Sequence, residues 1–389
     1  MKVCGIICEY NPFHTGHEYH IKQARKKTGA DCVVAIMSGN FTQRGDAAFF
    51  DKWLRARCAI LGGADIVIEL PFCFAAQTAE FFALGAVKML EECGCIDYLA
   101  FGCETDDLKA LENAALITAD KNVKAGISSG KSYPAALSGA KGGEILSPNN
   151  ILAIEYIRAL KTVKSKITPV CIKREGEGYN SDRTDGKFIS ASACRRLFET
   201  GDFKTLKKYI PHDIFAILQK CTDNGRFCKS ENLSSYVLGT LRSTGIFADG
   251  AYVSEGIENR INSAAVSAVT LDGLYDTVKT KRYTMARIKR IILNGILGVT
   301  DTDIKKYIAQ GCLYLNILDS NSAGYAFINN VKESSDITII SKMSDSEKLS
   351  GIQKEIYDLD FKSSLIYYLG MENKKYRAAG TEIMRGRDI

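Results

Sequence analysis

Three of the chain's four histidines lie within seven residues, in the stretch ICEYNPFHTGHEYHIKQA. His14 and His17 follow an apolar run, residues 2–9, that predicts a β-strand, and Gly16 lies between them where a helix is expected to start. A helix N-terminus presents free backbone N–H groups, and a glycine there allows a phosphate to approach the backbone. Two imidazoles three residues apart can point at one phosphate. We therefore predict that His14 and His17 stabilise attack on the α-phosphate of a nucleoside triphosphate, with pyrophosphate leaving.

Two other interpretations of this cluster stay open. The histidines are either ordinary surface residues of a helix start, or ligands of a zinc ion together with Cys4 and Cys8. The even spacing of these cysteines along the predicted strand, and the lack of a C-x-x-C pair, argue against zinc, and no metal ligand is assigned. His20, one turn further on, is expected to lie on the helix surface or to contact a ribose.

A second phosphate-binding pattern is ISASACRR, in which two serines open a predicted helix and an arginine follows in its first turns. Ser190, Ser192 and the helix-start amides can hold the β- and γ-phosphates, while Arg195 neutralises the leaving pyrophosphate. The alternative is an ordinary helix cap with arginines on the surface.

Short apolar runs alternate with amphipathic ones in the first half of the chain, which predicts an α/β fold with a doubly wound parallel sheet. The expected strands are residues 2–9, 32–37, 65–70, 98–101 and 167–172, and the expected helices are 16–27, 51–61, 78–92, 149–161 and 189–199. The Gly-, Ser- and Lys-rich segment 127–148 is expected to pass over the edge of the active site.

Helices dominate the pattern after Gly201. They are expected at residues 213–219, 231–243, 254–271 and 283–297, and strands at 313–318 and 337–340 flank one more helix at 323–332. We predict a catalytic domain over residues 1–201 and a mainly helical domain with a small α/β element over residues 202–389.

Composition limits the cellular setting. The net charge of +6 permits a polyanionic partner without requiring one. Several of the 13 cysteines, among them Cys4, Cys8, Cys32 and Cys171, lie in apolar segments, as buried thiols do in a reducing compartment. No signal peptide and no apolar run long enough to span a membrane is evident, so the protein is expected to be cytoplasmic.

The motifs NPFHTGH and I-S-x-S-x-x-R resemble the H-x-G-H nucleotidyltransferase superfamily, which implies a Rossmann-like, HUP-type domain. The blocks MSGNFTQRGDAAFFDKWLRARCAILGGADIVIELPF, SPNNILAIEYIRAL and KREGEGYN further resemble the bacterial tRNA(Met) cytidine acetate ligases, most closely over residues 1–200. The resemblance implies an ATP-dependent ligase that makes acetyl-adenylate, releases pyrophosphate, and acetylates the exocyclic amine of the wobble cytidine of elongator tRNA(Met). The products are N-acetylcytidine and AMP.

The resemblance also implies binding residues for ATP, and Mg²⁺ is a plausible counter-ion of ATP although no carboxylate cage for it is evident. Together with the two phosphate patterns, the expected ATP-binding residues are Ile7, Asn11, His14, Gly16, His17, His20, Gly102, Asn150, Arg174, Glu175, Ser190, Ser192 and Arg195.

The polar loop after the second strand, residues 38–46, fits a site for a small carboxylate at the edge where such sheets bind ligands. Arg44 can orient acetate, and Asn40, Thr42 and Gln43 can supply hydrogen bonds. The alternative is a polar surface loop.

The segment KTKRYTMARIKR contains six basic residues and no acidic one. A basic helix face with an aromatic side chain fits contacts to tRNA phosphates plus a stacked base, and the alternative is a solvated helix face. The expected tRNA-binding residues are Lys279, Lys281, Arg282, Tyr283, Arg287, Lys289 and Arg290.

Two competing functions remain. A small-molecule nucleotidyltransferase of cofactor biosynthesis would share the nucleotide site, and a tRNA-binding protein with a degenerate nucleotide site would share the basic segment. Acetate, the cytidine and tRNA(Met) follow from the resemblance alone.

Overall fold

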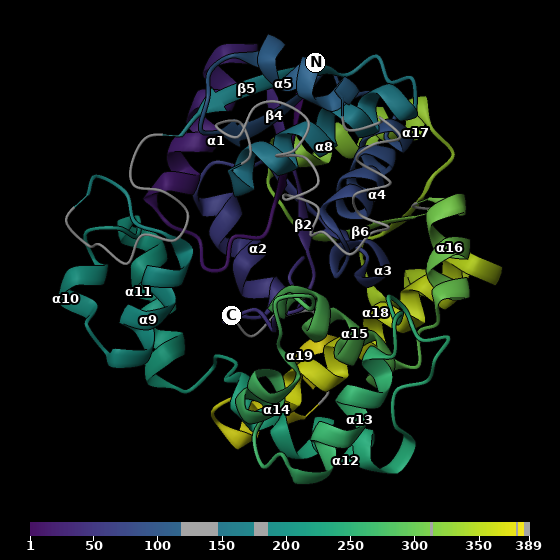
Figure 1. Ribbon diagram of the computed structural model, residues 1–389. Helices are drawn as coiled ribbons and strands as arrows, with labels where there is room; N and C mark the ends of the chain where they lie inside the picture. The colour runs from purple at the N-terminus through teal and green to yellow at the C-terminus, as the bar shows by residue number, and fades with distance from the viewer. Residues whose placement is uncertain (118–146, 175–185, 312–313, 379, 385–389) are drawn as a thin grey trace.

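A seven-stranded sheet crosses the centre of the molecule, with helices on both of its faces (Figure 1). The computed structural model describes residues 1–117, 147–174, 186–311, 314–378 and 380–384. The sheet order is β5-β4-β1-β2-β3-β6-β7. The strands are β1 (Val3–Cys8), β2 (Cys32–Ser38), β3 (Ile66–Leu70), β4 (Tyr98–Cys103), β5 (Thr168–Lys173), β6 (Tyr314–Ser320) and β7 (Thr338–Ile340).

The strand order places a topological switch point beside β1. The chain runs from β1 through β2 to β3 in one direction and then crosses to β4 on the other side of β1, and all these neighbours pair in parallel. In sheets of this type, ligands bind outside the carboxyl ends of the strands at the switch point. The histidine cluster follows β1, so the fold places it at this crevice.

Strand residues are buried on both faces of the sheet, as the apolar runs predict. Val33, Ala35 and Met37 of β2 join one apolar core, while Val34 and Ile36 join the other. Helices α1 and α2 cover the first face, and α4, α8 and α17 cover the second. The helices around the sheet are α1 (Thr15–Thr28), α2 (Lys52–Leu61), α3 (Phe72–Ala75), α4 (Ala79–Glu92), α5 (Leu108–Ile117), α8 (Pro148–Thr162) and α17 (Ser322–Ser334).

The strands of the second half extend the sheet of the first half. β6 pairs antiparallel with β3, with Ile66 opposite Ser320 and Glu69 opposite Asn316, and β7 lies parallel to β6 at the sheet edge. The small α/β element expected in the second half therefore continues the sheet of the first half, because the open edge of β3 is completed by a strand from far along the chain. The domain boundary at residue 201 stays a prediction.

Most of the remaining helices form a second layer below the sheet in Figure 1, apart from a small group beside α2. The group beside α2 is α9 (Ala191–Thr200), α10 (Phe203–Leu206) and α11 (His212–Asp223). The lower layer contains η2 (Ser230–Leu233), α12 (Ser234–Thr244), α13 (Ile257–Ser267), α14 (Leu271–Val278), α15 (Met285–Leu297), α18 (Gly351–Leu369), η4 (Lys374–Arg377) and α19 (Gly380–Ile383). Of the other two, α16 (Asp301–Gln310) packs on α3, and η3 (Met343–Lys348) packs on β7.

The expected helix 254–271 ends earlier, because α13 stops at Ser267 and a separate helix, α14, begins at Leu271. The backbone becomes extended at Ala268, and the Thr270 hydroxyl accepts the N–H of Gly273 to cap α14. α18 packs on α3 and α15 and so connects this layer to the sheet. Within the described residues, no helix is both long and apolar enough to cross a bilayer.

Candidate active site

A cavity of about 1170 Å³ lies over the carboxyl ends of β1 and β4, and most of the predicted ATP-binding residues line it. The polar loop lines it as well, together with residues of α14 and α15 such as Tyr275 and Lys289. The predicted ATP-binding residues in its wall are Ile7, Asn11, His14, Gly16, His17, His20, Gly102, Arg174, Ser190, Ser192 and Arg195.

His14 and His17 are held as a stacked pair by the start of α1. Their ring centroids are 3.7 Å apart and their planes differ by 21°. His14 Nδ1 accepts the N–H of Gly16 (3.1 Å), and His17 Nδ1 accepts the N–H of His14 (3.3 Å). Because each Nδ1 is an acceptor, the proton of each neutral ring is on Nε2, where it can be donated to a phosphoryl oxygen.

Burial keeps these imidazoles neutral. Burial and then the positive charge of Arg174 lower the pKa of His14 to about 3, and burial followed by His14 and Arg174 lowers the pKa of His17 well below its ordinary value. Gly16 is required by the same packing, because a Cβ there would lie 2.9 Å from Cε1 of His14. The site therefore offers two neutral N–H donors beside a cationic side chain.

The start of α9 supports the same segment. Ser190 caps the helix by accepting the N–H of Ala193 (3.1 Å). Arg195 donates from Nη1 to the carbonyl of Asn11 (2.6 Å) and from Nη2 to the hydroxyl of Ser192 (3.2 Å). Arg195 thus joins the two predicted phosphate-binding patterns, 184 residues apart in the sequence, at one edge of the cavity.

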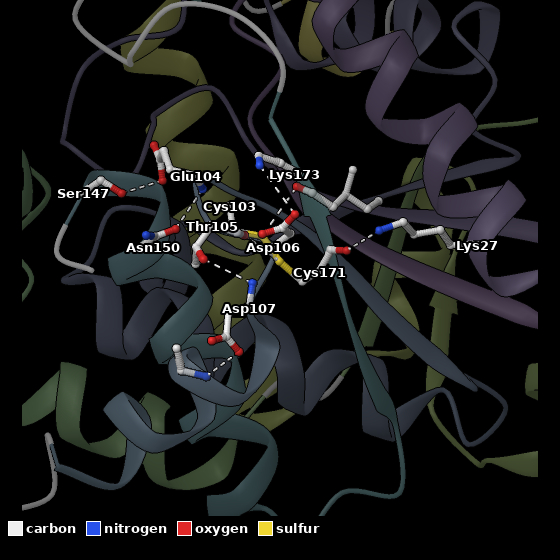
Figure 2. Close-up of a disulfide and its surroundings, with 12 residues drawn as sticks. Lys27, Cys103, Glu104, Thr105, Asp106, Asp107, Ser147, Asn150, Cys171 and Lys173 are labelled. Atoms are coloured by element: carbon white, nitrogen blue, oxygen red, sulfur yellow. Dashed lines mark hydrogen bonds and ion pairs between the residues drawn. A yellow bond between two sulfur atoms is a disulfide. The ribbon is translucent and has the colours of Figure 1, made fainter. Parts of the chain in front are cut away.

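The ends of β4 and β5 line another part of the cavity through residues such as Gly102 and Lys173. Figure 2 shows the side chains around these strand ends. Asn150 does not line the cavity: it is buried, and its Oδ1 accepts the N–H of Glu104 (2.9 Å), whereas the neighbouring Asn149 does line it. The position of Asn150 therefore does not favour the expected direct contact with ATP. Glu175 and nearly all of segment 127–148 lie outside the described residues.

Cys171 was expected to be a free buried thiol, but it forms a disulfide with Cys103 between β4 and β5 (Figure 2). The bond lies next to Gly102 in the sequence, and Arg174 follows β5 directly. The other ten cysteines in the described part of the chain lie outside disulfides.

The polar loop is divided between structural and cavity-facing residues. Asn40 is buried and both ends of its amide are used, since Nδ2 donates to Ser364 Oγ (3.1 Å) and Oδ1 accepts the N–H of Lys52 (2.8 Å). Its expected role as an acetate ligand conflicts with these contacts. Thr42, Gln43 and Arg44 line the cavity.

Two residues near this loop were not predicted from the sequence. Glu9 directly follows β1 and lines the cavity, and its Oε1 accepts the N–H of Gln43 (2.7 Å). Arg55 is buried in α2, and its Nη1 donates to the carbonyl of Glu9 (2.6 Å). An acid at the carboxyl end of the first strand, directly before the histidine motif, was the available signal for Glu9.

The basic segment is only partly a free surface. Lys289 Nζ lies 2.5 Å from Asp46 Oδ1, and Arg290 Nη1 donates to the carbonyl of Gln43 (3.3 Å), so both face the polar loop. Gly45 of the polar loop packs against the backbone of Lys289 and Arg290, with its φ at +83°. A Cβ at this position would lie 2.9 Å from the backbone nitrogen of Arg290, so only glycine fits. These contacts contradict the expected tRNA-facing position of Arg290 and favour a role for Lys289 at the cavity.

The other residues of the segment differ in exposure. Tyr283 is buried, and its hydroxyl donates to the carbonyl of Glu255 (3.2 Å), so its ring is not exposed for stacking on a base. Arg282 and Arg287 lie 2.8 Å and 3.9 Å from Glu255 Oε2. Lys279 and Lys281 are exposed.

Among the described residues, no group of three His, Cys, Asp or Glu side chains is arranged to hold a metal ion.

Comparisons with known proteins agree with this architecture. A family model described as "HIGH Nucleotidyl Transferase" matches residues 1–382. A protein of Acetivibrio thermocellus named tRNA(Met) cytidine acetate ligase is 38% identical over 407 residues, with 98% of each chain covered. A protein of the same name from Caldanaerobacter subterraneus subsp. tengcongensis is 36% identical over 390 residues, with 96% of each chain covered.

Two solved structures are similar throughout. The structure of Thermotoga maritima TmcAL bound with alpha-thio ATP has a TM-score of 0.90 and 30% identity, and 98% of each chain is covered. The apo structure of the Thermotoga maritima protein has a TM-score of 0.91 and 31% identity, again with 98% of each chain covered.

The burial of His14 predicts a specific loss of stability in acid. Because the folded-state pKa is depressed to about 3, protons bind the unfolded chain first as the pH falls below the unfolded value of about 6.5. The free energy of unfolding should therefore fall by about 2 kcal/mol between pH 7 and pH 5 through His14 alone. His14→Asn keeps a helix-capping acceptor but has no group that titrates in this pH range. Denaturant unfolding of this variant at pH 7 and pH 5 should therefore show a loss of unfolding free energy that is smaller than the wild-type loss by about 2 kcal/mol.

Equal acid sensitivity of the wild type and His14→Asn would contradict a buried, neutral His14.

Proposed function

Since the chain belongs to the tRNA(Met) cytidine acetate ligase family of H-x-G-H nucleotidyltransferases, we propose that it activates acetate with ATP and acetylates the wobble cytidine of elongator tRNA(Met). The observation that supports this most is the stacked pair of His14 and His17, whose Nε2–H groups are left for a ligand at the switch-point cavity. The cavity volume of about 1170 Å³ is enough for a nucleotide and a second substrate.

In the first step, a carboxylate oxygen of acetate attacks the α-phosphorus of ATP, and pyrophosphate leaves. His14 and His17 donate to the α-phosphoryl oxygens as negative charge develops there. Ser192, Arg195 and the start of α9 hold the β- and γ-phosphates. Thr42, Gln43 and Arg44 orient acetate, and a Mg²⁺ ion bound to ATP would neutralise part of the charge on its phosphates.

In the second step, the exocyclic amine of the cytidine attacks the acetyl carbon of acetyl-adenylate, and AMP leaves. The wall formed by α14 and α15 receives the target nucleoside, since the cavity extends there beyond the residues assigned to ATP. Residues 1–201 carry most of the nucleotide chemistry, and residues 202–389 supply most of the tRNA surface. We place the protein in the cytoplasm, where ATP and tRNA are available.

His17 provides the test of the activation step. The wild type should catalyse acetate-dependent exchange between pyrophosphate and ATP without tRNA. His17→Gln keeps a side chain that suits the third position of a helix, so the fold should persist. Loss of the positioned imidazole should lower the exchange rate by roughly 10²- to 10³-fold and leave the Kd for tRNA nearly unchanged.

The same assay separates the competing functions. The small-molecule nucleotidyltransferase would be favoured if the wild type exchanged pyrophosphate with ATP only when another small molecule, in place of acetate, accepted the adenylyl group. tRNA binding without any exchange would favour the tRNA-binding protein with a degenerate nucleotide site. Equal losses of exchange and tRNA affinity in His17→Gln would contradict the role given to this residue.

The exposed lysines of the basic segment provide a test of tRNA binding that spares the cavity. Lys279→Glu combined with Lys281→Glu should weaken tRNA binding and lower the slope of log Kd against log salt by about two, because two phosphate contacts are lost. Filter binding over a salt series measures this, and the acetate-dependent exchange rate should be unchanged.

A matched control places the same charge change elsewhere. Lys109→Glu combined with Lys332→Glu alters exposed positions on α5 and α17, on the opposite side of the sheet layer from α14 and α15 (Figure 1). This variant should bind tRNA as the wild type does. Equal weakening by both double variants would indicate a nonspecific effect of net charge and remove Lys279 and Lys281 from the tRNA site.

A further inference from the structure

Glu9 lies where the two halves of the cavity meet. It is the first residue after β1, five positions before His14, and its partly buried side chain lines the cavity. Its carboxylate reaches the polar loop, since Oε1 accepts the N–H of Gln43 (2.7 Å). Its backbone carbonyl accepts from Arg55 (2.6 Å). Glu9 is thus fixed between the segment assigned to the α-phosphate and the loop assigned to acetate.

One carboxylate oxygen of Glu9 is left for a ligand. Within the described residues Oε2 makes no hydrogen bond, and it is not among the fully buried unpaired atoms. Burial raises the pKa of Glu9 above its ordinary value, although the N–H of Gln43 and the charges of Arg55 and Arg44 oppose this shift. A carboxylate in such surroundings is a stronger base than one in water.

The second step of the proposed reaction needs a proton acceptor. As the amine nitrogen bonds to the acetyl carbon, it must lose a proton, and the bond between that carbon and the phosphate oxygen breaks with its electron pair leaving on AMP. The acceptor must reach the acetyl carbon, which lies between the α-phosphate and the acetate site. Glu9 occupies this position.

Other groups in the cavity wall are less suited. His14 and His17 already accept hydrogen bonds on Nδ1 and carry their proton on Nε2. Asp46 is paired with Lys289 across 2.5 Å. Resting on the proposed function, we propose that Glu9 is the general base that accepts the amine proton through Oε2 during acetyl transfer.

Glu9→Gln tests this assignment. The amide oxygen can still accept the N–H of Gln43, so the loop contact is kept while the basic oxygen is lost. We expect the rate of acetyl transfer to tRNA, measured in single turnovers, to fall by roughly 100-fold or more. Acetate-dependent ATP–pyrophosphate exchange should stay within about threefold of the wild type, because that step transfers no proton to Glu9.

The pH dependence gives a second readout that a structural role would not change. Acetyl transfer by the wild type should increase with pH as Glu9 loses its proton, and Glu9→Gln should lack this increase. Glu92→Gln, an exposed acid at the end of α4, is the matched control and should behave as the wild type.

Several outcomes would overturn the assignment. Unchanged acetyl transfer in Glu9→Gln would mean that another group, such as the phosphate of AMP, takes the proton. Equal loss of exchange and transfer would make Glu9 a structural residue. Failure of the wild type to exchange with acetate would instead reject the proposed function itself, so the two failures are distinguishable.

Discussion

The geometry of the cavity depends on the hydrogen bonds that the buried Arg55 side chain donates to the backbone. Its side chain is buried, and its guanidinium group donates to the backbone carbonyls of Glu9, Ser38, Gly39 and Phe50. Within the described residues it has no carboxylate partner at ion-pair distance. A buried charge of this kind is tolerated only when its donors are satisfied. The carboxyl ends of β1 and β2 are therefore held together, and with them the two loops that follow.

The chemistry of the site follows from this arrangement. The loop after β1 carries Glu9 and leads into the capped histidine pair, and the loop after β2 carries Gln43 and Arg44. Hydrogen bonds within the protein occupy Nδ1 of each histidine and direct Nε2–H toward a ligand. Burial keeps the rings neutral, so they act as donors that need no reorganisation when charge develops on a phosphate.

Most of the sheet and the nucleotide side of the site could be predicted from the sequence, because these features are local. Apolar runs in β1 to β5, the start of α1 and the serine start of α9 each follow from a few neighbouring residues. The placement of β6 beside β3 could not be predicted, because it depends on a pairing across some 250 residues of chain. The early end of α13 at Ser267 and the separate helix α14 were missed, because apolar residues continue across the turn between them.

The errors at individual residues have the same origin. Asn40 and Arg290 belong to polar segments of which other residues line the cavity, but their own side chains point to Ser364 and to the carbonyl of Gln43, contacts that only the tertiary structure provides. Tyr283 shows the converse, since an aromatic among lysines was expected at the surface and is packed inward. Local composition identified the segments, and long-range packing decided which of their residues reach the cavity.

A crystal structure with a non-hydrolysable ATP analogue and acetate would test the central claim most directly. The account predicts Nε2 of both His14 and His17 at about 3 Å from α-phosphoryl oxygens, with the acetate carboxylate on the side of Gln43 and Arg44. An α-phosphate held away from both rings, or acetate bound outside this cavity, would contradict it.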